Sequence, residues 1–97
     1  MVKIVKRPRA ELDLLEIWNF IAENNLDKAD ELLDLLAVKL QNLACNPGMG
    51  KRREELSVGL RSFPVRNFVV FYQEIEDGID VIRILHGSRD IESIFDL

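Results

Sequence analysis

Residues 60–90 read LRSFPVRNFVVFYQEIEDGIDVIRILHGSRD, and this stretch decides the fold. Two runs rich in aromatic and β-branched residues, 68–75 and 79–85, flank the dipeptide Asp77-Gly78. Asp-Gly favours a two-residue turn with positive φ at both central positions, so the pattern predicts a β-hairpin. A turn at Asp77-Gly78 would place Tyr72 opposite Arg83 and Phe71 opposite Ile84.

Period-two alternation distributes the side chains of this hairpin over two faces. One face is expected to carry Phe68, Val70, Tyr72, Glu74, Val81, Arg83 and Leu85, and the other Val69, Phe71, Gln73, Ile82, Ile84 and His86. Both faces are mostly apolar. Because one layer of helices covers only one face of a sheet, we expect the second face to need either its own segment or a partner.

The remaining sequence predicts one strand and two helices before the meander. Residues 2–6 alternate apolar and basic side chains, which is typical of an edge strand. Apolar positions recur with helical spacing over 9–24 and 26–44, which favours a helical hairpin over a coiled coil because the repeat is short. A further strand is expected over 60–65, and a short turn or helix over 88–96. The order β-α-α-β-β-β predicts an α+β domain in which an antiparallel sheet packs on an α-helical hairpin.

Composition limits the classes of function. The chain has 97 residues, a net charge of -4 and 47% hydrophobic residues, which predicts a single soluble domain over residues 1–97. The negative net charge argues against sequence-specific nucleic-acid binding. Cys45 is the only cysteine, so no disulfide can form within the chain, and a reducing cytoplasm suits it. No apolar run near the start is long enough for export or a membrane span, and we expect a cytoplasmic protein.

Few residues have the spacing of a chemical site. One His and one Cys offer no metal-ligand pattern, so neither a metal nor another cofactor is expected. His86 is suited to proton transfer near neutral pH, and the alternative is a histidine bonded to backbone at a strand end. Arg83 faces the helices in the predicted register and would need a carboxylate, for which Asp13 or Glu16 is the natural partner.

Five motifs in order resemble the ParE branch of the RelE/ParE toxin superfamily: Ala10-x-x-Asp-Leu-x-x-Ile-Trp18, Asn46-Pro-Gly-Met-Gly50, Gly59-Leu-Arg-Ser-Phe63, Phe68-Val-Val-Phe-Tyr72 and Ile82-Arg-Ile-Leu-His-Gly-Ser-Arg-Asp90. The resemblance spans nearly the whole chain. It implies the toxin of a type II toxin-antitoxin system, which an antitoxin neutralises by wrapping it in a helix and an extended segment. It also implies that toxin and antitoxin can assemble into a larger hetero-oligomer. It also implies DNA gyrase as the target, with growth arrest and plasmid stabilisation as consequences.

The other branch, similar to RelE, cuts messenger RNA in the ribosome with basic and aromatic residues on the open sheet face. Here Val69 stands where that branch has an arginine, and Phe95 stands for its C-terminal tyrosine. Neither residue can stabilise a phosphorane or donate a proton. A ribonuclease would therefore have to use Arg61, His86 and Arg89.

Three hypotheses follow, of which the first is a non-enzymatic toxin that binds proteins. Its antitoxin-binding surface is predicted to comprise Leu12, Leu15, Leu35, Val38, Val69, Phe71, Ile82 and Ile84. Its target-binding residues are predicted to be Arg61, Arg66 and Arg89, and Asp13 and Arg83 are assigned structural roles. The second hypothesis is the ribosome-dependent ribonuclease, and the third is an inert member that only pairs with an antitoxin.

Overall fold

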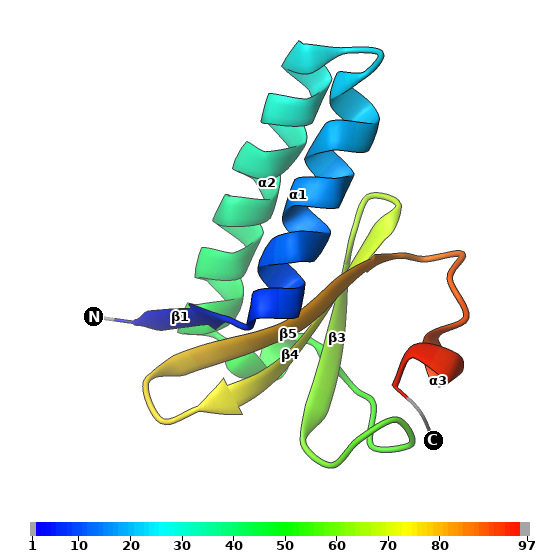
Figure 1. Cartoon of the computed structure of the whole chain (residues 1–97). Coiled ribbons are helices and arrows are strands. Elements are labelled where there is room, and N and C mark those ends of the chain that lie inside the picture. Colours follow the sequence, from blue (N-terminus) through cyan, green and yellow to red (C-terminus); the bar gives the residue numbers. More distant parts are fainter. Residues whose placement is uncertain (1, 96–97) are drawn as a thin grey trace.

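The computed structural model describes residues 2–95, in which two long helices pack beside a strongly twisted sheet (Figure 1). Met1, Asp96 and Leu97 lie outside the described residues, so the predicted C-terminal element can be followed only as far as Phe95. The elements are β1 (Lys3–Lys6), α1 (Pro8–Ala22), α2 (Leu26–Cys45), a 3-10 helix η1 (Pro47–Met49), β2 (Lys51–Arg52), β3 (Leu60–Val65), β4 (Phe68–Ile75), β5 (Gly78–His86) and α3 (Ile91–Ile94). Across residues 2–95, no helix is both long and apolar enough to cross a membrane.

The predicted α+β class is confirmed, but the sheet is mixed rather than purely antiparallel. Its strand order is β1-β5-β4-β3-β2. Strands β2 to β5 form the antiparallel meander, whereas β1 pairs with β5 in parallel. Parallel neighbours require a crossover connection, and the helices provide it by carrying the chain across one face of the sheet.

Local chemistry explains where the helices begin. Pro8 occupies the first turn of α1, where its missing N–H costs no helical hydrogen bond. The side chain of Asn25 caps α2 by accepting a hydrogen bond from the Lys28 amide at 3.0 Å. The indole Nε1–H of Trp18 then donates to Asp30 at 2.9 Å, which ties the two helices together near the end of the hairpin.

The predicted hairpin exists, but its register differs from the expected one. Ile75 pairs with Gly78, so Glu76 and Asp77 are the two turn residues. Gly78 does not adopt a positive φ. A Cβ atom at this position would instead collide with the carbonyl oxygen of Lys3 on the adjacent strand. The glycine is therefore required by the close approach of β1, not by the turn.

A β-bulge further along the hairpin corrects the predicted faces. Tyr72 pairs with Val81, but Phe71 pairs with Arg83, so the register shifts by one residue between them. An extra residue on one strand reverses the alternation beyond it. Ile84 consequently packs on the helix side and Leu85 on the opposite side, which is the reverse of the prediction for both.

The two faces carry separate clusters of buried apolar residues. On the helix side, α1 and α2 cover Val70, Ile79, Val81 and Ile84, with Leu36 and Leu43 almost completely buried. The second cluster consists of Leu56, Leu60, Phe71 and Leu85, against which Val69, Ile82, Ile91, Ile94 and Phe95 pack. Of the two expected ways to cover the second face, the structure shows the first: segments of the chain itself, the 53–59 loop and α3, cover it.

Candidate functional site

Arg83 forms an ion pair with Asp13, one of its two predicted partners. Asp13 is 4% exposed, and its two oxygens accept hydrogen bonds from the Nε and Nη2 of Arg83 at 2.8 and 3.1 Å. The amide of Ile84 donates to the same carboxylate at 3.0 Å. One aspartate on α1 thus satisfies both a guanidinium group and a backbone amide beside the bulge of β5.

The three arginines predicted to contact a target do not form one patch. Arg61 is opposite Tyr72, which in turn pairs with Val81. Arg66, with φ of 55°, lies in the turn that follows the other end of β3. The next strand, β4, starts at Phe68, which pairs with His86 at the end of β5. Arg61 therefore belongs to one end of the sheet, and Arg66 and the chain leading to Arg89 belong to the other.

The same separation contradicts the ribonuclease set of Arg61, His86 and Arg89. His86 lies five residues beyond Val81 on β5, which corresponds to about 16 Å at about 3.3 Å per strand residue. A general acid or base must come within hydrogen-bonding distance of the reacting group. These residues do not surround one scissile bond in this structure.

His86 forms a local turn with Ser88. The amide of Ser88 donates to Nδ1 of His86 at 3.1 Å, and the Ser88 hydroxyl lies 2.7 Å from the same nitrogen. Since Nδ1 accepts the amide proton, the neutral ring carries its own proton on Nε2. Phe68 packs edge-on against the ring with centroids 5.4 Å apart. This agrees with the alternative of a backbone-bonded histidine at a strand end.

A hollow of about 350 Å³ lies between α1 and the end of β5. Ile17, Phe20 and Phe68 supply apolar walls, while Glu16 and Arg89 contribute charged groups. Phe20 is 72% exposed, which makes it a large apolar side chain at the surface that the predicted binding set did not include.

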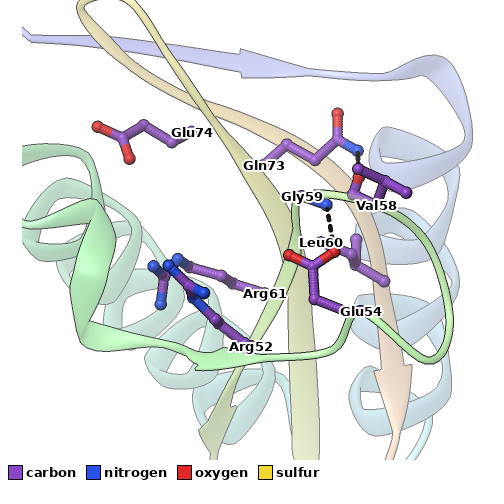
Figure 2. A pocket seen from close by; sticks show the side chains of 8 residues that line it. All are labelled: Arg52, Glu54, Val58, Gly59, Leu60, Arg61, Gln73 and Glu74. Atoms are coloured by element: carbon purple, nitrogen blue, oxygen red, sulfur yellow. Dashed lines mark hydrogen bonds between the residues drawn. The ribbon is translucent and has the colours of Figure 1, made fainter.

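At the other end of the sheet, a second hollow of about 340 Å³ contains Arg52 and Arg61 (Figure 2). Arg61 is oriented by its hydrogen bond from Nη1 to the carbonyl oxygen of Gly50 at 2.8 Å. Arg52 is directly opposite Arg61 on β2. No site was predicted at Arg52 from the sequence, because only the pairing of the two-residue strand β2 with β3 places it beside Arg61.

Tyr72 anchors the loop behind these arginines. Its hydroxyl donates to the Pro47 carbonyl oxygen at 2.6 Å and accepts from the Gly50 amide at 2.9 Å. Burial raises the pKa of the Tyr72 hydroxyl, and the Gly50 amide and nearby Arg61 partly offset this rise. A neutral, buried hydroxyl is therefore what connects η1 to the sheet.

The predicted antitoxin-binding residues differ widely in accessibility. Phe71 and Ile84 are 0% and 1% exposed, so neither is available at the surface, because the second cluster and the bulge bury them. Leu35, Val69 and Ile82 are partly buried in the two clusters. The exposed members are Leu12, Leu15 and Val38.

No three His, Cys, Asp or Glu side chains within residues 2–95 lie close enough to hold a metal ion.

The exposed side chain of Glu55 has a lowered pKa because Arg53 donates a hydrogen bond to it at 2.8 Å. Arg53 also contacts Ser62 and lies 5.8 Å above the Phe71 ring. The arrangement stabilises the loop over the second cluster and offers no reacting group.

Comparison with known proteins relates both sequence and fold to one group. A family described as "ParE toxin of type II toxin-antitoxin system, parDE" matches residues 4–91. Toxin ParE1 of Mycobacterium tuberculosis is 31% identical over 87 residues, covering 88% of this chain and 89% of that protein. Toxin ParE1 of Caulobacter vibrioides is 32% identical over 83 residues, covering 84% and 85% respectively.

A solved structure described as "Chromosomal ParDE TA system from P. aeruginosa" has the same fold, with a TM-score of 0.72. Its sequence is 20% identical, and the superposition covers 89% of this chain and 96% of that chain. Toxin RelE3 of Caulobacter vibrioides is also similar, at 27% identity over 81 residues, covering 82% and 88%.

Proposed function

This chain belongs to the ParE toxin family of type II toxin-antitoxin systems, and we propose that a cognate antitoxin neutralises it and that the free toxin inhibits DNA gyrase. Both steps are protein–protein binding in the cytoplasm, and the proposal assigns no covalent chemistry to the toxin. Growth arrest follows when the antitoxin is lost.

The observation that carries this proposal is the apolar filling of the sheet face opposite the helices. The ribonuclease branch that the sequence resembles less closely uses basic and aromatic residues on that face. Here Leu56, Leu60, Phe71 and Leu85 are buried there, and Phe95 packs on Phe71 with ring centroids 5.0 Å apart. A face closed by apolar side chains supports a toxin that acts by contact with proteins rather than by cutting RNA.

The accessible part of the predicted antitoxin surface is the helical hairpin. Leu12 and Leu15 are one turn apart on α1 and are 42% and 55% exposed. Val38 lies between the buried Leu36 and Leu40 on α2 and is 57% exposed, so it points away from the core. We propose these three as contacts for an amphipathic segment of the antitoxin, whose apolar residues would bury them.

Inhibition of gyrase is tested by incubating purified toxin with gyrase and relaxed plasmid, with and without ATP. The expected result is loss of supercoiling or accumulation of cleaved plasmid, reversed by prior addition of the antitoxin. Translating ribosomes with a labelled message form the parallel arm. Message cleavage without any effect on gyrase would overturn the proposal in favour of the ribonuclease, and inactivity in both arms would indicate an inert member.

The docking surface is tested separately with Leu15→Glu. A charge in the contact should weaken antitoxin binding at least about tenfold, since burying an unpaired carboxylate is unfavourable. The matched control is Leu26→Glu, which changes a leucine that is 59% exposed at the start of α2, outside the proposed surface. Equal binding of both variants in isothermal titration calorimetry would contradict this surface.

A further inference from the structure

We propose that Arg52 and Arg61 form a binding site for a single carboxylate group on a peptide segment of a protein partner. The two residues are directly opposite each other on β2 and β3, where Cβ atoms are about 5 Å apart. Figure 2 shows their guanidinium groups side by side. Two like charges in this arrangement repel each other, and a carboxylate between them replaces that repulsion with two attractions.

The partner for these charges does not come from the described part of the chain. The ion pairs formed within residues 2–95 involve Arg7, Arg9, Arg53 and Arg83, and neither Arg52 nor Arg61 takes part in one. Planar guanidinium groups present several N–H donors at once and match the two oxygens of a carboxylate. The pair therefore has donor groups and charge available for an external anion.

The site is partly organised before any ligand arrives. One nitrogen of Arg61 is occupied by the Gly50 carbonyl at 2.8 Å, and Gly50 is itself held by Tyr72. A Cβ atom at Gly50 would collide with the Tyr72 ring and hydroxyl, so this loop packs tightly against the sheet. Fixing one arginine beforehand reduces the conformational entropy that binding would otherwise cost.

The surroundings favour one carboxylate over a nucleic acid. Glu54 and Glu74 also line the hollow, and Glu54 already accepts a hydrogen bond from the Gly59 amide at 3.2 Å. Two acidic walls would repel successive phosphates along a strand, and the net charge of the chain is -4. A single negative group can approach between the arginines without an extended negative backbone behind it.

An apolar neighbour of the carboxylate also has a place to bind. Val58 lines the same hollow and is 84% exposed. Its carbonyl oxygen accepts a hydrogen bond from Gln73 at 3.2 Å, which connects this part of the loop to β4. We therefore expect the ligand to be an acidic residue adjacent to an apolar one in an exposed peptide segment.

This inference rests on the proposed function only in taking the partner to be a protein. The experiment accordingly uses the full-length toxin alone, with neither antitoxin nor gyrase. Arginine Nε–Hε and backbone amide signals are followed by NMR during titration with acetyl-Glu-Leu-amide. The neutral isostere acetyl-Gln-Leu-amide, inorganic phosphate and a hexathymidylate are titrated in parallel.

The expected result is a saturable shift of the Arg52 and Arg61 signals with the glutamate peptide, and little shift with the glutamine peptide. Arg52→Gln should weaken binding at least about tenfold, the expectation for a lost charge-assisted hydrogen bond. Arg61→Lys keeps the charge but loses the planar fork, and should weaken binding as well. Thermal unfolding of both variants checks that the fold is retained.

Lys51→Gln is the matched control, because it removes one positive charge from the same two-residue strand. Lys51 is opposite Ser62, and alternation directs it to the other face from Arg52. The affinity of the Lys51→Gln variant for acetyl-Glu-Leu-amide should equal that of the parent protein. The proposal is overturned by the absence of a saturable shift, by equal binding of the two peptides, by tighter binding of phosphate or hexathymidylate, or by equal effects of Lys51→Gln and Arg52→Gln. None of these outcomes depends on whether gyrase is the target.

Discussion

The two faces of the sheet are covered by very different amounts of the chain. Among residues 2–95, the cluster between the helices and the sheet contains twelve buried residues, whereas the cluster under the loop and the short α3 contains four. The first face is therefore covered by a thick layer of interlocked side chains. The second face is covered only by side chains from two small segments. This difference predicts that stability is unequal across the sheet, with the second face opening first.

The largest expected effect concerns Asp13, which connects the helical layer to β5. Asp13→Ala leaves the guanidinium group of Arg83 and the amide of Ile84 without their buried acceptor, so the free energy of unfolding should fall by about 3–5 kcal/mol. Urea unfolding followed by circular dichroism measures this loss of unfolding free energy. Glu16→Ala breaks only an exposed contact with Arg9 at 3.8 Å and should cost about 1 kcal/mol or less. Similar losses for both variants would contradict the structural role of Asp13.

A direct comparison of the two faces uses one leucine from each. Leu36 and Leu56 are both 1% exposed, and replacement of a buried leucine by alanine costs about 2–5 kcal/mol. We expect Leu36→Ala near the upper end of that range, because two helices and the sheet surround the cavity. Leu56→Ala is expected near the lower end, because the loop can collapse into the space. Equal losses in urea unfolding would show that the two layers are equally rigid.

Tyr72→Phe tests how firmly η1 is held to the helix-side face. Without the hydroxyl, the Pro47 carbonyl and the Gly50 amide lose their shared partner, and the free energy of unfolding should fall by about 1–3 kcal/mol. Differential scanning calorimetry at neutral pH measures the change. An unchanged melting temperature would indicate that water replaces the hydroxyl at no cost.

The difference in stability between the parent protein and Tyr72→Phe should depend on pH. Burial raises the pKa of Tyr72, so the folded protein keeps this proton when the unfolded chain begins to lose it near pH 10. The stabilisation is complete below about pH 10 and decreases as the pH rises further. The difference in stability between the parent and Tyr72→Phe should therefore shrink in alkaline solution. A difference that grows with pH would have the wrong sign.

The smallest expected effect lies at the edge of the second cluster. Phe95→Ala removes the ring that packs on Phe71 and should cost about 1 kcal/mol, since aromatic pairs contribute about 0.5–1.5 kcal/mol beyond their burial. Hydrogen exchange should accelerate at the amides of α3 and remain unchanged for α2. Faster exchange throughout both helices would mean that the two faces do not open independently.

The accuracy of the sequence-based prediction depended on how far apart the deciding contacts are. The helical hairpin and the existence of the β-hairpin were predicted correctly, and Asp13 is one of the two partners predicted for Arg83, because periodicity and the need to neutralise a buried charge leave few alternatives. The predicted register was wrong at Gly78, because the glycine is required by the close approach of Lys3 and not by the turn. The predicted faces of Ile84 and Leu85 were wrong because no local sequence pattern marks the bulge at Phe71 and Tyr72.

The candidate sites show the same limit. Arg61 was predicted to contact a target together with Arg66 and Arg89, and the strand register places Arg61 far from Arg66 and from the end of β5 that leads to Arg89. Arg52 was overlooked among the charged residues 51–55. Only the pairing of β2 with β3 brings it opposite Arg61.

By itself, the sequence determined the two long helices, four of the five strands and the family to which the chain belongs. These properties depend on side-chain periodicity, turn chemistry and motifs that act over a few neighbouring residues. Only the tertiary structure decided that β1 runs parallel to β5, that Leu56 and α3 cover the second face, and that Arg52 meets Arg61. Such features depend on contacts between residues distant in the chain, where packing among many segments, rather than local preference, selects the arrangement.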